Sequence, residues 1–150
     1  MTMIETRGLT KEYGDVTAVT DVDLTVEPGE IHGFVGHNGA GKTTTMQMLT
    51  GLVTPSSGEA YIGGEPAGTR AATKKIGYAP QDPAFYESMT GRDYLTYMGK
   101  LSAVDGSARD RADELLARLD LEEAADQAVG GYSGGMLRRL AVGQAMLGDP

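Results

Sequence analysis

The sequence predicts an α/β fold, and three observations lead to this class. Residues 36–43 fit the pattern Gly-x-x-x-x-Gly-Lys-Thr at every fixed position. An apolar segment at 30–35, typical of a buried strand, leads into this loop. A helix-forming segment at 44–50 leaves the loop and stops at Gly51. This strand–loop–helix order is that of a phosphate-binding loop, in which backbone N–H groups at a helix N-terminus hold an anion.

The residue types in the loop suit a polyphosphate. Glycines let the backbone wrap closely around the anion and point its N–H groups inward. Lys42 adds a positive charge for the β- and γ-phosphates, and the hydroxyl of Thr43 suits Mg²⁺. The alternative, a glycine-rich turn that happens to end in Lys-Thr, is disfavoured by the flanking strand and helix. We therefore predict that the chain binds a nucleoside triphosphate.

Composition and charge narrow the class of protein. The 150 residues suit about one domain, and 40% are hydrophobic, which is enough for a core. The sequence has no cysteine, no apolar run that could span a bilayer and no signal-peptide pattern, so we expect a cytosolic protein. The net charge of −8 argues against a nucleic-acid partner. The acidic excess between Asp105 and Asp126 fits either a solvated helical face or adaptation to high salt.

The residues around the loop predict an antiparallel sheet beside it. Alternating apolar and polar residues, or short apolar runs bounded by turns, predict strands at 2–6, 16–26, 59–62 and 74–79. A polar stretch at 9–15 closes on a Gly-Asp turn between the first two strands. The strand at 74–79 runs into residues 80–83, where two prolines predict an irregular loop.

The second half of the chain predicts helices. Thr90 and Ser107 each stand three residues before an aspartate, which is a capping-box pattern at a helix start. In the first helix, Tyr94, Met98 and Leu101 share a face, which favours core packing over a binding surface. The second helix has one apolar stripe, formed by Ala112, Leu115, Leu116 and Leu119.

A third helix is predicted from Ser133, its N-cap, through Leu147. Its inward face would carry Leu137, Leu140 and Ala141. The Gly-Gly pair that follows Ser133 lowers helix propensity. Taken alone, this start fits a second anion site and a plain glycine-containing cap equally well.

Together these motifs resemble the ATP-binding subunit of an ABC (ATP-binding-cassette) transporter. Tyr13 lies where that family places an aromatic residue that stacks on adenine, and residues 36–44 are its phosphate loop. Gln81 matches a glutamine that touches Mg²⁺ and contacts the membrane partner. Residues 132–136, Tyr-Ser-Gly-Gly-Met, resemble the family signature Leu-Ser-Gly-Gly-Gln. Many ATPases and GTPases share the loop, but the loop and the signature together are specific to this family.

The resemblance implies a P-loop core with an antiparallel β subdomain and a helical subdomain at about residues 85–130. Residues 1–150 would be the N-terminal part of one ATP-binding domain, incomplete at its C-terminus. The implied cofactors are ATP and Mg²⁺, with Thr43 and Gln81 at the metal. The implied nucleotide-binding residues are Tyr13, Gly36, His37, Asn38, Gly39, Ala40, Gly41, Lys42, Thr43, Thr44, Gln81, Ser133, Gly134 and Gly135.

Two departures from the family pattern bear on function. Tyr132 and Met136 replace the usual Leu and Gln, a variant that resembles prokaryotic exporters of the drug-resistance type. The second departure is that the sequence stops at Pro150. In the family, the segment that follows would carry the Mg²⁺-binding Asp, the catalytic Glu and a switch His. The chain alone is therefore expected to bind ATP without efficient hydrolysis. The full-length protein is expected to be an ATPase that drives export.

The implied partners are a membrane-spanning permease subunit and a second ATPase subunit, in a homodimer or paired dimer around two ATP molecules. This places the protein in the cytoplasm, on the inner face of the cell membrane. Two alternatives are a soluble ABC-type ATPase that acts on DNA or ribosomes and a non-catalytic nucleotide-binding fragment with a regulatory role. The chain has no room for the long coiled coil of the DNA-repair members, and its acidic segment argues against the basic arms of the ribosome-acting ones.

Overall fold

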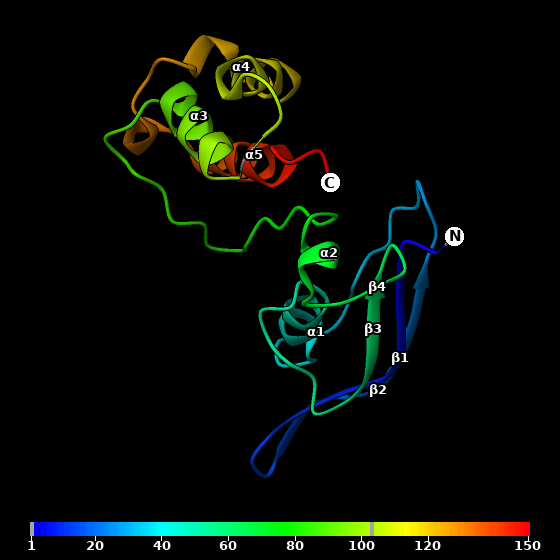
Figure 1. Ribbon diagram of the computed structural model, residues 1–150. Helices are drawn as coiled ribbons and strands as arrows, with labels where there is room; N and C mark the ends of the chain where they lie inside the picture. The colour runs from blue at the N-terminus through cyan, green and yellow to red at the C-terminus, as the bar shows by residue number, and fades with distance from the viewer. Residues whose placement is uncertain (1, 103) are drawn as a thin grey trace. The chain divides into compact units, whose positions relative to one another are not determined.

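The structure, a computed structural model, describes residues 2–102 and 104–150. The chain forms two compact units, Met1–Ile76 and Gly77–Pro150 (Figure 1). The first unit is built on an antiparallel sheet and the second on helices. Within the described ranges, no helix has the length and apolar character needed to cross a membrane.

The sheet of the first unit has four antiparallel strands in the order β2-β1-β3-β4. The strands are β1 (Ile4–Tyr13), β2 (Val16–Val26), β3 (Ser57–Ile62) and β4 (Glu65–Pro66). The predicted strands at 2–6, 16–26 and 59–62 are confirmed. The polar stretch from residue 9 proves to be strand as far as Tyr13, because it continues to pair with β2 until Tyr13 faces Val16. The predicted Gly-Asp turn closes this hairpin.

Two short helices, α1 (Lys42–Leu49) and α2 (Arg70–Thr73), lie on the same side of the sheet (Figure 1). The inward face of α1 is Thr45, Met48 and Leu49, at the i, i+3, i+4 spacing of one helix face. The core beneath the two helices consists of Leu9, Val19, Met48, Leu49, Ala60, Ile62 and Ala72. This packing fixes the start of α1, and with it the glycine-rich loop, against the sheet.

The predicted strands at 30–35 and 74–79 are wrong. A strand needs a neighbour to satisfy its backbone groups, and neither segment joins the sheet of the described residues. Ile31 and Val35 are 99% and 98% exposed. The start of the second segment completes α2 instead, since the N–H groups of Lys74 and Lys75 donate to carbonyls of Arg70 and Ala72.

The described residues of the second unit form three helices, α3 (Gly91–Leu101), α4 (Ala108–Arg118) and α5 (Gly134–Met146). Two 3₁₀ turns, η1 (Glu122–Ala124) and η2 (Val129–Gly131), connect α4 to α5. All three predicted N-caps are confirmed. The side-chain oxygens of Thr90, Ser107 and Ser133 each accept the N–H of the third residue onward, at 3.1, 3.2 and 3.2 Å.

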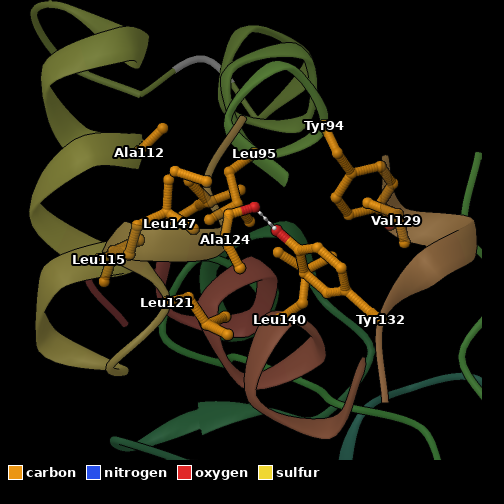
Figure 2. Close-up of a cluster of buried hydrophobic side chains, with 12 residues drawn as sticks. Tyr94, Leu95, Ala112, Leu115, Leu121, Ala124, Val129, Tyr132, Leu140 and Leu147 are labelled. Carbon is orange, nitrogen blue, oxygen red and sulfur yellow. Dashed lines mark hydrogen bonds between the residues drawn. The ribbon is translucent and has the colours of Figure 1, made fainter. Parts of the chain in front are cut away.

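A buried cluster joins the three helices and the 3₁₀ turns, as Figure 2 shows. The predicted apolar stripe of α4 is part of this cluster, with Leu119 packed at its edge. The prediction that Leu101 packs in the core is wrong, because its side chain is 64% exposed. At that end of α3, the residue that packs against Ala108 and Leu147 is the buried Gly99. A Cβ there would lie 3.2 Å from Ala108 and 3.6 Å from Leu147, so the side of α3 that carries Gly99 faces the core.

Candidate functional site

The glycine-rich loop is closed on itself by Lys42. The ammonium nitrogen of Lys42 donates to the carbonyl oxygens of Gly36 at 2.5 Å and His37 at 2.7 Å. The carbonyl of His37 also accepts the N–H of Ala40 at 3.1 Å. The positive charge is therefore held at the loop backbone in advance of any ligand. His37 contributes its backbone to this closure, while its ring nitrogen Nδ1 lies 2.8 Å from the Asn38 carbonyl.

Helix α1 begins with backbone N–H groups that precede its first helical hydrogen bond. The first bond along the helix runs from the Thr45 N–H to the Gly41 carbonyl at 2.8 Å, and the Thr45 hydroxyl donates to the same carbonyl at 2.9 Å. The N–H groups of residues 42–44 precede that bond, and no side chain caps the helix at Gly41 in the described part of the chain. These donors and the helix dipole favour an anion, so the loop fits a phosphate group.

Gly41 also holds the loop against strand β2. Its φ of +86° is in the left-handed region that favours glycine. A Cβ at this position would lie 2.4 Å from the Ala18 carbonyl oxygen and 2.9 Å from Cγ2 of Val19. The start of β2 therefore packs directly against the phosphate loop at Gly41. Sequence reasoning missed Ala18 and Val19, because nothing in the local pattern of β2 marks a contact with a distant glycine.

Tyr13 is the last residue of β1 and is 50% exposed. It pairs with Val16, so it belongs to the same hairpin as the β2 residues that pack against Gly41. The Lys11 ammonium lies 5.0 Å from the centroid of the Tyr13 ring. An accessible aromatic ring therefore stands at the end of the strand pair that adjoins the phosphate loop. Lys11 is a further residue that sequence reasoning missed, although alternation along a strand places residues 11 and 13 on one face.

The signature, residues 132–136, forms the start of α5. Ser133 caps the helix, and Gly134 and Gly135 occupy its first turn. All three are exposed. A Cβ on Gly134 would meet nothing within 4 Å, and one on Gly135 would meet only the Ser133 hydroxyl oxygen at 3.9 Å. The glycines therefore leave the backbone at this helix start open to a ligand or a partner surface.

Tyr132, the first residue of the signature, is a core residue. It is 7% exposed, and its hydroxyl donates to the Ala124 carbonyl at 2.7 Å (Figure 2). Burial raises the pKa of the Tyr132 phenol, so it stays neutral and acts as a donor. A Cβ on Gly91 would lie only 2.1 Å from the Tyr132 oxygen. Tyrosine therefore fits at this position because Gly91 leaves space for its hydroxyl and Ala124 supplies an acceptor.

We expect Tyr132→Phe to lower the free energy of unfolding by about 1 kcal/mol, because the Ala124 carbonyl loses one of its two hydrogen bonds and keeps the one from the Gln127 N–H. Gly91→Ala should cost more, about 1–3 kcal/mol, because the added methyl group overlaps the tyrosine oxygen. Denaturant unfolding of the two variants measures both effects. Gly134→Ala, which adds the same methyl group in open space, is the matched control for Gly91→Ala. Stability equal to the parent in Tyr132→Phe would show that the hydrogen bond is not important.

Gln81 lies in the second unit and is exposed. It lines a hollow of about 290 Å³ together with Asp82, Pro83, Phe85, Gly134, Leu137 and Arg138. The structure thus brings Gln81 and the signature start to one hollow, and Arg138 and Asp82 are charged neighbours that sequence reasoning missed. The predicted site residues form two groups, with Tyr13 and residues 36–44 in the first unit and Gln81 and residues 133–135 in the second.

Comparison with known proteins identifies the class. Residues 19–150 match the family model described as ABC transporter. The chain therefore belongs to the ABC transporter family, as part of an ATP-binding domain.

Several curated relatives match nearly the whole chain. The uncharacterized ABC transporter ATP-binding protein YxlF of Bacillus subtilis is 43% identical over 99% of this chain and 50% of its own length. Nod factor export ATP-binding protein I of Cupriavidus metallidurans is 42% identical over 99% of this chain and 50% of its own. Linearmycin resistance ATP-binding protein LnrL of Bacillus subtilis is 38% identical over 99% of this chain and 49% of its own. The chain spans about half the length of these relatives.

A solved structure shows the fold. The chain matches cbiO1 of Clostridium perfringens, part of the ABC transporter complex cbiONQ, with a TM-score of 0.86 at 24% identity. The match covers 99% of this chain and 62% of cbiO1. The predicted α/β fold class is therefore confirmed by a structural match over nearly the whole chain.

Proposed function

We propose that the chain is the ATP-binding part of a subunit that drives export through a separate membrane subunit. The observation that carries this proposal is the phosphate loop. The Lys42 ammonium is held at 2.5 and 2.7 Å from loop carbonyls, next to a helix start that no described side chain caps. A charge and a set of N–H donors in this arrangement support binding of a polyphosphate.

The residues that would hold ATP are Tyr13 and residues 36–44 in the first unit. Mg²⁺ bound with the nucleotide would neutralise charge on the β- and γ-phosphates, and the exposed Thr43 hydroxyl is the loop's ligand for it. Gln81 is the second proposed metal ligand. Ser133, Gly134 and Gly135 would serve a nucleotide held by a second subunit. The chain alone would bind ATP without efficient hydrolysis, and the whole protein would be the transport ATPase.

Export is proposed over import for two reasons. Two of the relatives are named for Nod factor export and for linearmycin resistance. The signature of this chain also carries Tyr132 and Met136, the variant that resembles exporters of the drug-resistance type. The partners would be a permease in the membrane and a second copy of the ATPase subunit. This places the protein on the cytoplasmic face of the membrane. The net charge of −8 gives no support for a nucleic-acid partner.

The nucleotide proposal is tested at Tyr13. Stacking of a base on an aromatic ring is worth roughly 1–3 kcal/mol, so Tyr13→Ala should weaken ATP binding about ten- to a hundred-fold. Tyr13→Phe keeps the ring and should bind ATP like the parent. Calorimetry with Mg-ATP and with inorganic triphosphate separates base from phosphate recognition. Equal losses of affinity for the two ligands would mean that Tyr13 is structural and that the base does not stack on it.

A further inference from the structure

Lys11 connects the proposed base-stacking ring to the turn that follows α1. Its ammonium lies 5.0 Å from the Tyr13 ring centroid and also donates to the Thr54 carbonyl at 2.8 Å. We propose that Lys11 is a positioning residue for adenine, which holds the Tyr13 ring in the orientation that the base stacks on. The proposal rests on the proposed stacking of adenine on Tyr13.

The turn that anchors Lys11 is itself fastened to the end of β1. The Ser56 N–H donates to the Thr10 carbonyl at 2.9 Å, and the Glu12 N–H donates to the Ser56 hydroxyl at 3.0 Å. Lys11 adds a further connection between the turn and β1, this one through a side chain of the strand. Because it donates to a backbone carbonyl, the ammonium is held beside the Tyr13 ring.

The position of Lys11 leaves one face of the ring for a ligand. A cation over an aromatic face is attracted by the ring quadrupole, and the contact occupies that face. Tyr13 nevertheless remains 50% exposed, so an aromatic base would use the opposite face. Without the cation, the tyrosine side chain at the end of the hairpin loses its support on the occupied face. The favourable free energy of base binding would then be reduced by the entropy lost when the ring becomes ordered.

A solvated lysine is the alternative role, and three features of Lys11 argue against it. The residue is only partly exposed, its ammonium donates to a backbone carbonyl, and it lies over the ring two positions along the strand. Lys74 provides the contrast. It is exposed and follows α2 at its C-cap. Lys74→Met therefore changes the net charge by the same amount without touching Tyr13, which makes it the matched control.

The experiment measures the affinity of the complete gene product for Mg-ATP and for inorganic triphosphate by calorimetry. We expect Lys11→Met to weaken ATP binding about two- to five-fold and to leave triphosphate binding unchanged, given the usual strength of an exposed cation–π contact. Lys11→Arg, which keeps the cation, should restore the parent affinity. Lys74→Met should bind both ligands like the parent. In a Tyr13→Ala background, Lys11→Met should have no further effect.

Three results would overturn the proposal, and they are distinguishable. Equal weakening of ATP and triphosphate by Lys11→Met would mean that Lys11 acts through charge or stability and not through the base. An unchanged ATP affinity in Lys11→Met, with a selective loss in Tyr13→Ala, would reject Lys11 and keep the stacking. A non-selective loss in Tyr13→Ala would reject the stacking and, with it, the role of Lys11.

Discussion

Lys42→Ala is expected to abolish ATP binding. The Lys42 ammonium is the cation that the structure holds at the loop, on the carbonyls of Gly36 and His37. Its removal leaves the phosphates only neutral N–H donors and at the same time opens the loop that the ammonium closes. Both effects act on the phosphate end of the ligand, so affinity for inorganic triphosphate should be lost together with affinity for ATP.

Ligand-induced stabilisation measures this effect. At about 100 times its dissociation constant, Mg-ATP should stabilise the parent by about 2.7 kcal/mol, and it should not stabilise Lys42→Ala. Lys75→Ala is the matched control in the same unit, because the Lys75 ammonium also donates to a backbone carbonyl, that of Gly63, at 2.8 Å. The control should keep the full stabilisation by ATP. An equal stabilisation of parent and Lys42→Ala would overturn the assignment of the phosphate loop.

The same variant tests the proposed role in transport. A strain that lacks the gene should regain export when it expresses the parent protein, and it should not regain export with Lys42→Ala. Membrane preparations from both strains would show whether the protein is bound there. Full recovery of export with a variant that no longer binds ATP would mean that the subunit does not power transport.

The local features of this fold could be predicted from sequence, because their partners are close along the chain. Thr90, Ser107 and Ser133 each cap a helix through an N–H three residues away, so a four-residue pattern contains the whole interaction. The phosphate loop is equally local, since Lys42 closes it on carbonyls only five and six residues earlier.

The features that could not be predicted depend on distant partners. The segment at 30–35 has the composition of a buried strand, but a strand also requires a neighbour, and no described strand lies beside it. Leu101 fits the apolar face of α3, yet Gly99 determines which side of the helix approaches α4. The Lys11 ammonium is positioned by its hydrogen bond to the carbonyl of Thr54, a residue far along the chain. Periodicity reports which side chains share a face and not which element covers that face.

Ser133→Arg is expected to prevent ATP-dependent dimerisation while leaving the ATP affinity of the monomer nearly unchanged. The loop and the signature belong to different units of the chain, and Ser133 is not part of the phosphate loop. The helix start at Ser133 is exposed and open, with hydroxyl and N–H groups that suit the nucleotide of a second subunit. A long cationic side chain would fill this open space and hold the partner subunit away.

Sedimentation of the complete gene product, with and without a non-hydrolysable ATP analogue, measures the effect. The parent should dimerise only with the nucleotide, and Ser133→Arg should stay monomeric in both conditions. Ser107→Arg is the matched control, because Ser107 caps α4 with the same 3.2 Å contact that Ser133 makes in α5. Both variants lose a helix cap, worth about 0.5–2 kcal/mol, so only an effect specific to the signature separates them. A parent dimer that forms without nucleotide, or a Ser133→Arg monomer that no longer binds ATP, would mean that residues 132–136 do not face the nucleotide of a partner.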